Sequence, residues 1–139
     1  MFKNLKVLEL SSVLAGPAVG MFFSELGAQV VKVENKTTNG DVTRKWKLPN
    51  EEKSDLSAYF CSVNYNKNYI FLDFNNQKDR TELEILIKNC DIVITNFKGE
   101  DAAKFNLNFE DCKKINSNII YAHIGGFKSN PNRVAFDIV

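Results

Sequence analysis

The stretch from Val7 to Glu34 constrains the fold more than any other part of the chain. It reads VLELSSVLAGPAVGMFFSELGAQVVKVE, so an apolar run leads into a Gly-Pro turn and a second apolar run ends on an acid. Residues 17–26 carry apolar side chains at helical spacing, and Pro17 fits the first turn of a helix, where its missing N–H costs nothing. The stretch therefore predicts a strand, a tight turn, a helix and a second strand.

Strand-like runs alternate with segments of helical spacing along the rest of the chain. We expect strands at 6–10, 29–33, 69–72, 92–95 and 119–124, and helices at 17–26, 77–89 and 109–115. This alternation predicts an α/β fold of Rossmann-like type, with a mostly parallel sheet flanked by helices. A length of 139 residues suits a single domain over residues 1–139.

Residues 35–57 interrupt the alternation. The segment contains Gly40, Pro49, many charges and few apolar side chains, so we expect a long excursion over the surface. Loops of this length in compact domains are usually functional or poorly ordered.

Composition and charge exclude several classes of protein. A formal net charge of +1 gives no electrostatic reason to expect nucleic acid or an anionic membrane as a partner. The sequence has neither a transmembrane run of 18 apolar residues nor the pattern of a signal peptide. Cys61, Cys90 and Cys112 are scattered thiols that suit a reducing compartment and lack metal-ligand spacing. We therefore expect a cytoplasmic protein without a metal site.

The Gly-Pro turn has three interpretations. The free amides of a helix that begins near Ala15 would bind a phosphate or another anion. A dinucleotide site is a second reading, since Glu34 ends the second strand where a ribose-binding acid would sit, although the spacing is not G-x-G-x-x-G. In the third reading, Gly16 and Gly20 only allow the helix to pack closely on the strand. From geometry alone, the third reading is favoured over the dinucleotide site.

Other polar residues lie near the expected strand ends. His123 lies in an apolar run and is more simply explained as a core or strand-end residue than as a catalyst. Gly125 and Gly126 follow at the carboxyl end of a strand, where α/β sheets bind ligands. Basic side chains that flank strand ends and suit a phosphorylated ligand are Arg44, Lys45, Lys67, Lys98 and Lys104.

Taken together, five blocks of the sequence resemble the family III CoA-transferases, the group that contains formyl-CoA transferase, carnitine CoA-transferase and α-methylacyl-CoA racemase. The blocks are LKVLELSSVLAGPAVGMFFSELGAQVVKVE at 5–34, GDVTR at 40–44, NYNKNYIFLDF at 64–74, DIVITNFKGE at 91–100 and INSNIIYAHIGGF at 115–127. They cover nearly the whole chain, in order and with similar spacing. The resemblance implies the N-terminal, CoA-binding portion of such a protein, incomplete relative to the family.

The resemblance also implies which residues contact CoA. Three groups lie at or after the ends of expected strands, and a single basic residue comes later. They are Val13, Leu14 and Ala15; Leu72, Asp73, Phe74 and Asn75; Asn96, Phe97 and Lys98; and the basic residue Lys104. On this reading the amides of residues 15–18 hold a polar part of CoA, and Lys98 and Lys104, with Lys67 or Arg44, offset phosphate charge.

The family's reaction moves CoA between an acyl-CoA and a carboxylic acid through a mixed anhydride on an aspartate. The resemblance places that aspartate in a later segment, so that Asp137 is not the nucleophile and the chain alone is expected to be inactive. It also implies an interlocked homodimer for the full-length family. A racemase on the same scaffold and a non-catalytic CoA-binding or oligomer-forming remnant remain alternatives, and the acyl group is not determined.

Overall fold

The computed structural model describes residues 1–53, 56–130, 132–133 and 135, and Asp137 lies outside this range. Its strands are β1 (Lys6–Leu10), β2 (Gln29–Asn35), β3 (Asn68–Leu72), β4 (Ile92–Thr95) and β5 (Ile120–His123). They form one five-stranded sheet in the order β3-β2-β1-β4-β5, and every neighbouring pair is parallel. The predicted α/β fold with a parallel sheet is therefore confirmed, and the carboxyl ends of the strands share one edge.

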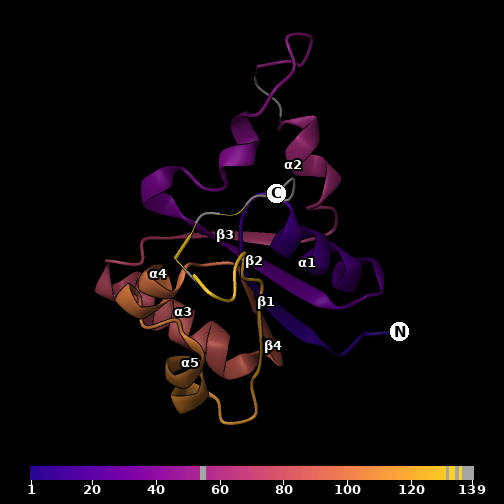
Figure 1. Ribbon diagram of the computed structural model, residues 1–139. Helices are drawn as coiled ribbons and strands as arrows, with labels where there is room; N and C mark the ends of the chain where they lie inside the picture. The colour runs from indigo at the N-terminus through magenta and orange to yellow at the C-terminus, as the bar shows by residue number, and fades with distance from the viewer. Residues whose placement is uncertain (54–55, 131, 134, 136–139) are drawn as a thin grey trace.

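Helices cover both faces of this sheet (Figure 1). The helices are α1 (Ala15–Glu25), α2 (Ala58–Ser62), α3 (Gln77–Asn89), α4 (Gly99–Lys104) and α5 (Phe109–Ile115). Helix α1 packs on β1, β2 and β4 over a core that includes Val7, Val30 and Ile94. Helices α3 and α5 bury Ile87 and Cys112 against the opposite face. Each face thus has its own apolar core.

Capping side chains fix several helix starts. Asn76 accepts hydrogen bonds from the backbone N–H groups of Lys78 and Asp79 at the start of α3, and Asn108 accepts from Asp111 at the start of α5. The structure confirms the predicted bounds of these two helices, of β1 and of β4. The short helices α2 and α4 were not predicted.

The segment 35–57 is less exposed than the sequence suggested. It forms two short 3₁₀ helices, η1 (Lys36–Thr38) and η2 (Val42–Lys45), and Asp41, Thr43 and Ser57 within it are buried. The carboxylate of Asp41 caps η2 by accepting hydrogen bonds from the backbone N–H and hydroxyl of Thr43. Contacts of Asp41 with Lys32 and of Arg44 with Glu34 join the segment to β2. The expectation of a surface segment agrees with most of the described residues here and is wrong for Asp41, Thr43 and Ser57.

Two glycines allow α1 to lie directly on the polar end of β1. A methyl group on Gly16 would lie 2.3 Å from the hydroxyl of Ser11, and one on Gly20 would lie 1.9 Å from a carboxylate oxygen of Glu9. Side chains larger than hydrogen do not fit at these distances. The packing interpretation of the two glycines is consistent with this geometry.

Gly20→Ala is expected to destabilise the protein by about 1 kcal/mol. Alanine gains about 1 kcal/mol of helix propensity, but overpacking typically costs 1–3 kcal/mol, and here the new methyl group would displace the buried Glu9. Gly99→Ala is the matched control, because its added methyl group would lie 3.4 Å from Asn132 Oδ1, an ordinary contact. Urea unfolding measures both free energies. A Gly20→Ala variant as stable as the parent would show that α1 is not in close contact with Glu9.

Candidate functional site

A pocket of about 400 Å³ opens at the carboxyl edge of the sheet. Its apolar lining comes from strand ends and the residues after them: Leu10, Val33, Phe74 and Phe97. Its polar rim includes Ser12, Asn35, Thr38, Asn39 and Lys45. This edge is where open parallel sheets bind ligands, at the point where the strand order reverses around β1. The pocket is therefore the candidate site.

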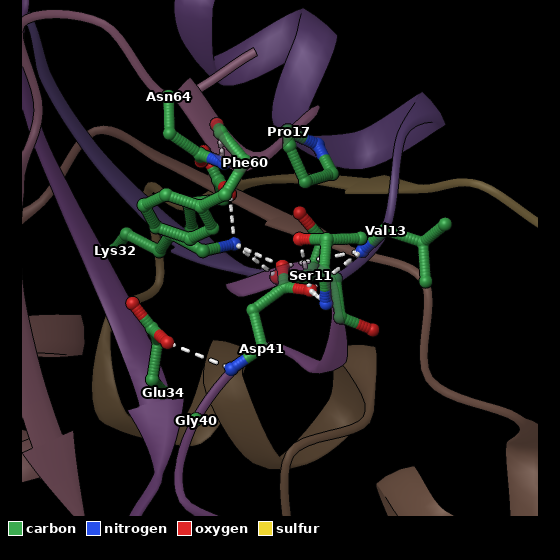
Figure 2. Close-up of polar contacts among 12 residues, drawn as sticks. Ser11, Val13, Pro17, Lys32, Glu34, Gly40, Asp41, Phe60 and Asn64 are labelled. Atoms are coloured by element: carbon green, nitrogen blue, oxygen red, sulfur yellow. Dashed lines mark hydrogen bonds and ion pairs between the residues drawn. The ribbon is translucent and has the colours of Figure 1, made fainter. Parts of the chain in front are cut away.

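The loop between β1 and α1 borders this pocket, and three side chains hold its backbone. Figure 2 shows two of them, Lys32 and Asp41. Lys32 Nζ donates to the carbonyl of Ser11 at 2.7 Å. Asn96 both accepts from the N–H of Ser12 at 3.1 Å and donates to its carbonyl at 2.8 Å. The carboxylate of Asp41 accepts from the N–H of Val13 at 3.2 Å. Side chains from three separate segments thus fix the loop.

The first turn of α1 leaves backbone donors free. Leu14, Ala15 and Gly16 have no hydrogen-bond acceptor for their N–H groups within the described residues, and Leu14 provides no side-chain cap. Val13, Leu14 and Ala15, the first predicted group of CoA contacts, therefore lie at the positive end of a helix dipole. An anionic group of a ligand is stabilised at such a position.

Four charged side chains form a buried ion cluster beneath α1: Glu9, Lys32, Asp41 and Lys67. Lys32 Nζ lies 2.8 Å from Glu9 Oε1 and 3.2 Å from Asp41 Oδ2, and Lys67 Nζ lies 2.7 Å from Glu9 Oε2. Figure 2 shows Lys32 and Asp41 converging on Ser11 and Val13. All four side chains are at most 1% exposed. Buried charges of this kind are tolerated only when paired, and two carboxylates here offset two ammonium groups.

Lys67 and Arg44 serve the fold and are not placed to offset ligand phosphates. Lys67 Nζ donates to the carbonyls of Pro17 and Val63 at 2.7 Å besides pairing with Glu9. Burial lowers the pKa of Lys67, and the Glu9 carboxylate opposes this shift. Arg44 donates two hydrogen bonds to the carboxylate of Glu34, and this bonding raises the pKa of Arg44. The same pairing occupies the carboxylate of Glu34, so it does not support the ribose-binding reading.

The second and third groups of predicted CoA contacts meet at the same edge. The side chains of Leu72 and Phe74 are buried, whereas Asp73 and Asn75 form the turn into α3, where Asp73 accepts from the N–H of Asn75 at 2.9 Å. Phe97 packs edge-on against Phe74, with ring centroids 6.1 Å apart, and both line the pocket. The structure thus brings the predicted groups together, although only two of their members line the pocket itself.

The predicted cations Lys98 and Lys104 are exposed on or beside α4. Lys98 precedes the helix, and Lys104 Nζ lies 5.3 Å from the ring centroid of Phe105. That ring packs on Phe74, with centroids 5.2 Å apart, so Lys104 lies one aromatic layer from the pocket. Lys45 is also exposed and lines the pocket directly. Within the described part of the chain these three lysines form no ion pair.

The sequence analysis missed the role of Glu9, Lys32 and Asp41. A signal was present, since Glu9 and Lys32 are charged residues inside the apolar runs VLEL and VVKVE, and parallel strands are buried on both faces.

His123 ends β5, is exposed, and its Nε2 lies 2.9 Å from the carbonyl oxygen of Phe97, which agrees with a strand-end role. Among the described residues, no group of three or more His, Cys, Asp or Glu could hold a metal ion. The search of these residues also found no helix that is both long and apolar enough to span a membrane.

Comparisons with known proteins find relatives along nearly the whole chain. The family model for CoA-transferase family III matches residues 2–139. The succinate–glutarate CoA-transferase of Agrobacterium fabrum is 37% identical over 128 residues, which cover 89% of this chain and 32% of that protein. The formyl-CoA:oxalate CoA-transferase of Afipia carboxidovorans is 36% identical over 128 residues, or 92% of this chain and 30% of that protein.

A solved structure also matches the fold. The crystal structure of a CAIB/BAIF family protein from Brucella suis superposes with a TM-score of 0.88 at 38% identity. The match covers 98% of this chain and 37% of that one. The chain thus spans about a third of the length of the relatives that it matches.

Lys32→Met is expected to destabilise the protein by about 3–5 kcal/mol, because it leaves the buried carboxylate of Asp41 without its cation and removes one of two cations beside Glu9. Methionine reproduces the lysine side chain as far as Cε, so lost packing adds little. Lys114→Met is the control, since Lys114 pairs with Asp111 at the surface and should change stability by less than about 0.5 kcal/mol. Urea unfolding measures the difference. A loss below about 1 kcal/mol for Lys32→Met would contradict a central role for this ammonium group.

Proposed function

This chain belongs to CoA-transferase family III, and we propose from that membership that residues 1–139 form the N-terminal CoA-binding domain of a CoA-transferase. The substrates of such a protein are an acyl-CoA and a carboxylic acid, and the product is a new acyl-CoA. The observation that carries the proposal is the pocket at the carboxyl edge of the sheet, which combines apolar walls, free helix amides beside it and exposed lysines. These features match the apolar, phosphate and polar parts of CoA.

In the proposed complex each part of the site has a separate task. The aromatic and aliphatic lining of Phe74, Phe97 and Leu10 would pack against an apolar part of the carrier. The N–H groups of Leu14 and Ala15 would donate to a polar group, and Lys45, Lys98 and Lys104 would offset phosphate charge. Pairing with Glu9 and Glu34 removes Lys67 and Arg44 from this list.

The chemical step is proposed to use an aspartate from outside these 139 residues. In that step the carboxylate attacks the acyl carbonyl, CoA leaves as the thiolate, and a mixed anhydride forms. The acceptor carboxylate then attacks the aspartyl carbonyl of this anhydride, and the donor acid leaves as a carboxylate. The CoA thiolate attacks the acceptor acyl carbonyl of the new anhydride, which forms the new acyl-CoA and frees the aspartate. A racemase on the same scaffold remains the alternative, but the relatives described above are named as CoA-transferases, which favours transfer. An interlocked homodimer and a cytoplasmic location are part of the same proposal.

The chain is expected to bind CoA, with saturable heat in isothermal titration calorimetry that weakens as salt is added. Lys104→Ala should weaken binding about three- to tenfold, the loss expected for one charge-assisted contact. Lys88→Ala is the matched control, because Lys88 is an exposed lysine in the last turn of α3. Absence of heat at millimolar CoA, or equal losses in the two variants, would contradict the proposed site.

The purified 139-residue chain is expected to transfer no CoA between an acyl-CoA and a carboxylic acid, because the proposed nucleophile lies outside it. The measurement is chromatography of acyl-CoA products after incubation with succinyl-CoA and a series of carboxylates. Turnover that disappears on substitution of a residue in this chain would overturn the assignment of residues 1–139 to binding alone.

A further inference from the structure

We propose that Asp41 is a positioning residue for the loop between β1 and α1, and that its buried carboxylate holds Val13 in the backbone conformation that ligand binding requires. The inference rests on the proposed function, because it assigns a ligand-binding role to this loop. It concerns a residue whose carboxylate is already bonded within the protein.

The backbone of Val13 needs to be held. Its φ is +71°, in the left-handed region that β-branched residues strongly disfavour. A residue in such a conformation persists only when its surroundings determine it, and such residues concentrate at ligand-binding sites. Val13 immediately precedes the residues whose N–H groups are free, so its φ sets where those donors point.

Asp41 supplies the hydrogen bond that acts on this residue. Within the described residues its carboxylate is the acceptor for the N–H of Val13, at 3.2 Å from Oδ2 and 3.4 Å from Oδ1. Lys32 and Asn96 instead hold Ser11 and Ser12, the two preceding residues of the loop. The loop therefore depends on Asp41 at Val13, the residue with the disfavoured backbone conformation.

Asp41 is itself fixed on every side. Its side chain is 1% exposed and lies 3.2 Å from Lys32 Nζ. Its Oδ1 accepts from the N–H and hydroxyl of Thr43, and its own N–H donates to Glu34 Oε2 at 2.7 Å. These contacts use the carboxylate oxygens within the protein. Asp41 is among the residues that line the pocket, but because its carboxylate is bonded within the protein, we expect it to act on a ligand through Val13.

This arrangement couples two walls of the pocket. Asn39 and Lys45 line the pocket from the same segment that carries Asp41, while Ser12 lines it from the loop. The bond between Asp41 and Val13 ties the segment to the loop, so the rim and the helix amides are preorganised as one unit. Preorganisation of this kind raises affinity because less ordering remains to be done on binding.

The test is Asp41→Asn, measured by CoA titration and by amide hydrogen exchange of Val13. The side chain of asparagine has one acceptor oxygen, whereas the N–H groups of Val13 and Thr43 bond to two different oxygens of Asp41. The N–H of Val13 should therefore lose its protection against hydrogen exchange. The Kd for CoA should rise on the order of tenfold. Asp91→Asn is the matched control, because Asp91 accepts from the N–H of Lys6 at 2.8 Å at the opposite edge of the sheet. It should change the Kd by less than about twofold.

A double-mutant cycle with Val13→Asn separates positioning from a general structural role. Asparagine adopts the left-handed conformation several-fold more readily than valine, so Asp41→Asn should cost less than about threefold in affinity in that background. Equal losses in both backgrounds would overturn the proposal. If Asp41→Asn alone does not fold, recovery of folding in the double variant supports it, and failure of both variants to fold contradicts it.

Hydrogen exchange keeps the two proposals distinguishable. If the unaltered chain binds no CoA, the proposed function fails. Loss of Val13 protection in Asp41→Asn then still supports control of the loop by Asp41. Unchanged protection of Val13 in this variant overturns the positioning role whether or not CoA binds.

Discussion

The ammonium group of Lys32 is the interaction on which the rest of the structure depends. It is fully buried and contacts Glu9 of β1, the carbonyl of Ser11 and Asp41. Taking one such ion out of water costs several kcal/mol, which is offset only when its hydrogen bonds are satisfied. The three acceptors around Lys32 come from β1, the loop after it and the segment after β2, so the charge holds these parts in one arrangement.

This polar centre makes the two faces of the sheet different. The face under α3 and α5 is closed by apolar packing around Leu83 and Ile87. The face under α1 carries the ion cluster at its carboxyl end, and the helix can cover it only because Gly20 has no side chain. Lys67 then ties the cluster to α1 through the carbonyl of Pro17. The conformation of the Gly-Pro turn therefore depends on a buried ion cluster.

The sequence predicted the sheet well because apolar runs and helical spacing are local signals. The bounds of β1, β4, α3 and α5 follow directly from them. The ion cluster was missed because spacing does not show which carboxylate a lysine meets across a crossover. The short helix α2 depends on Ser57, whose hydroxyl accepts from the N–H of Phe60, a cap that is too local to distinguish from a turn. The burial of Asp41 depends on its ion pair with Lys32 of β2, which the sequence does not show.

In the proposed CoA complex, the paired and the unpaired cations would contribute differently to binding an anion. The charges of Lys67 and Arg44 are already offset by carboxylates within bonding distance, so their fields largely cancel at the ligand. Lys45, Lys98 and Lys104 are exposed and unpaired within the described chain, and salt screens such charges over about 8 Å at physiological ionic strength. The helix amides next to Val13 are fixed dipoles held by Asp41, and they need no side-chain ordering. Long-range attraction to a phosphate should therefore come from the lysines, whereas the geometry of binding comes from the loop.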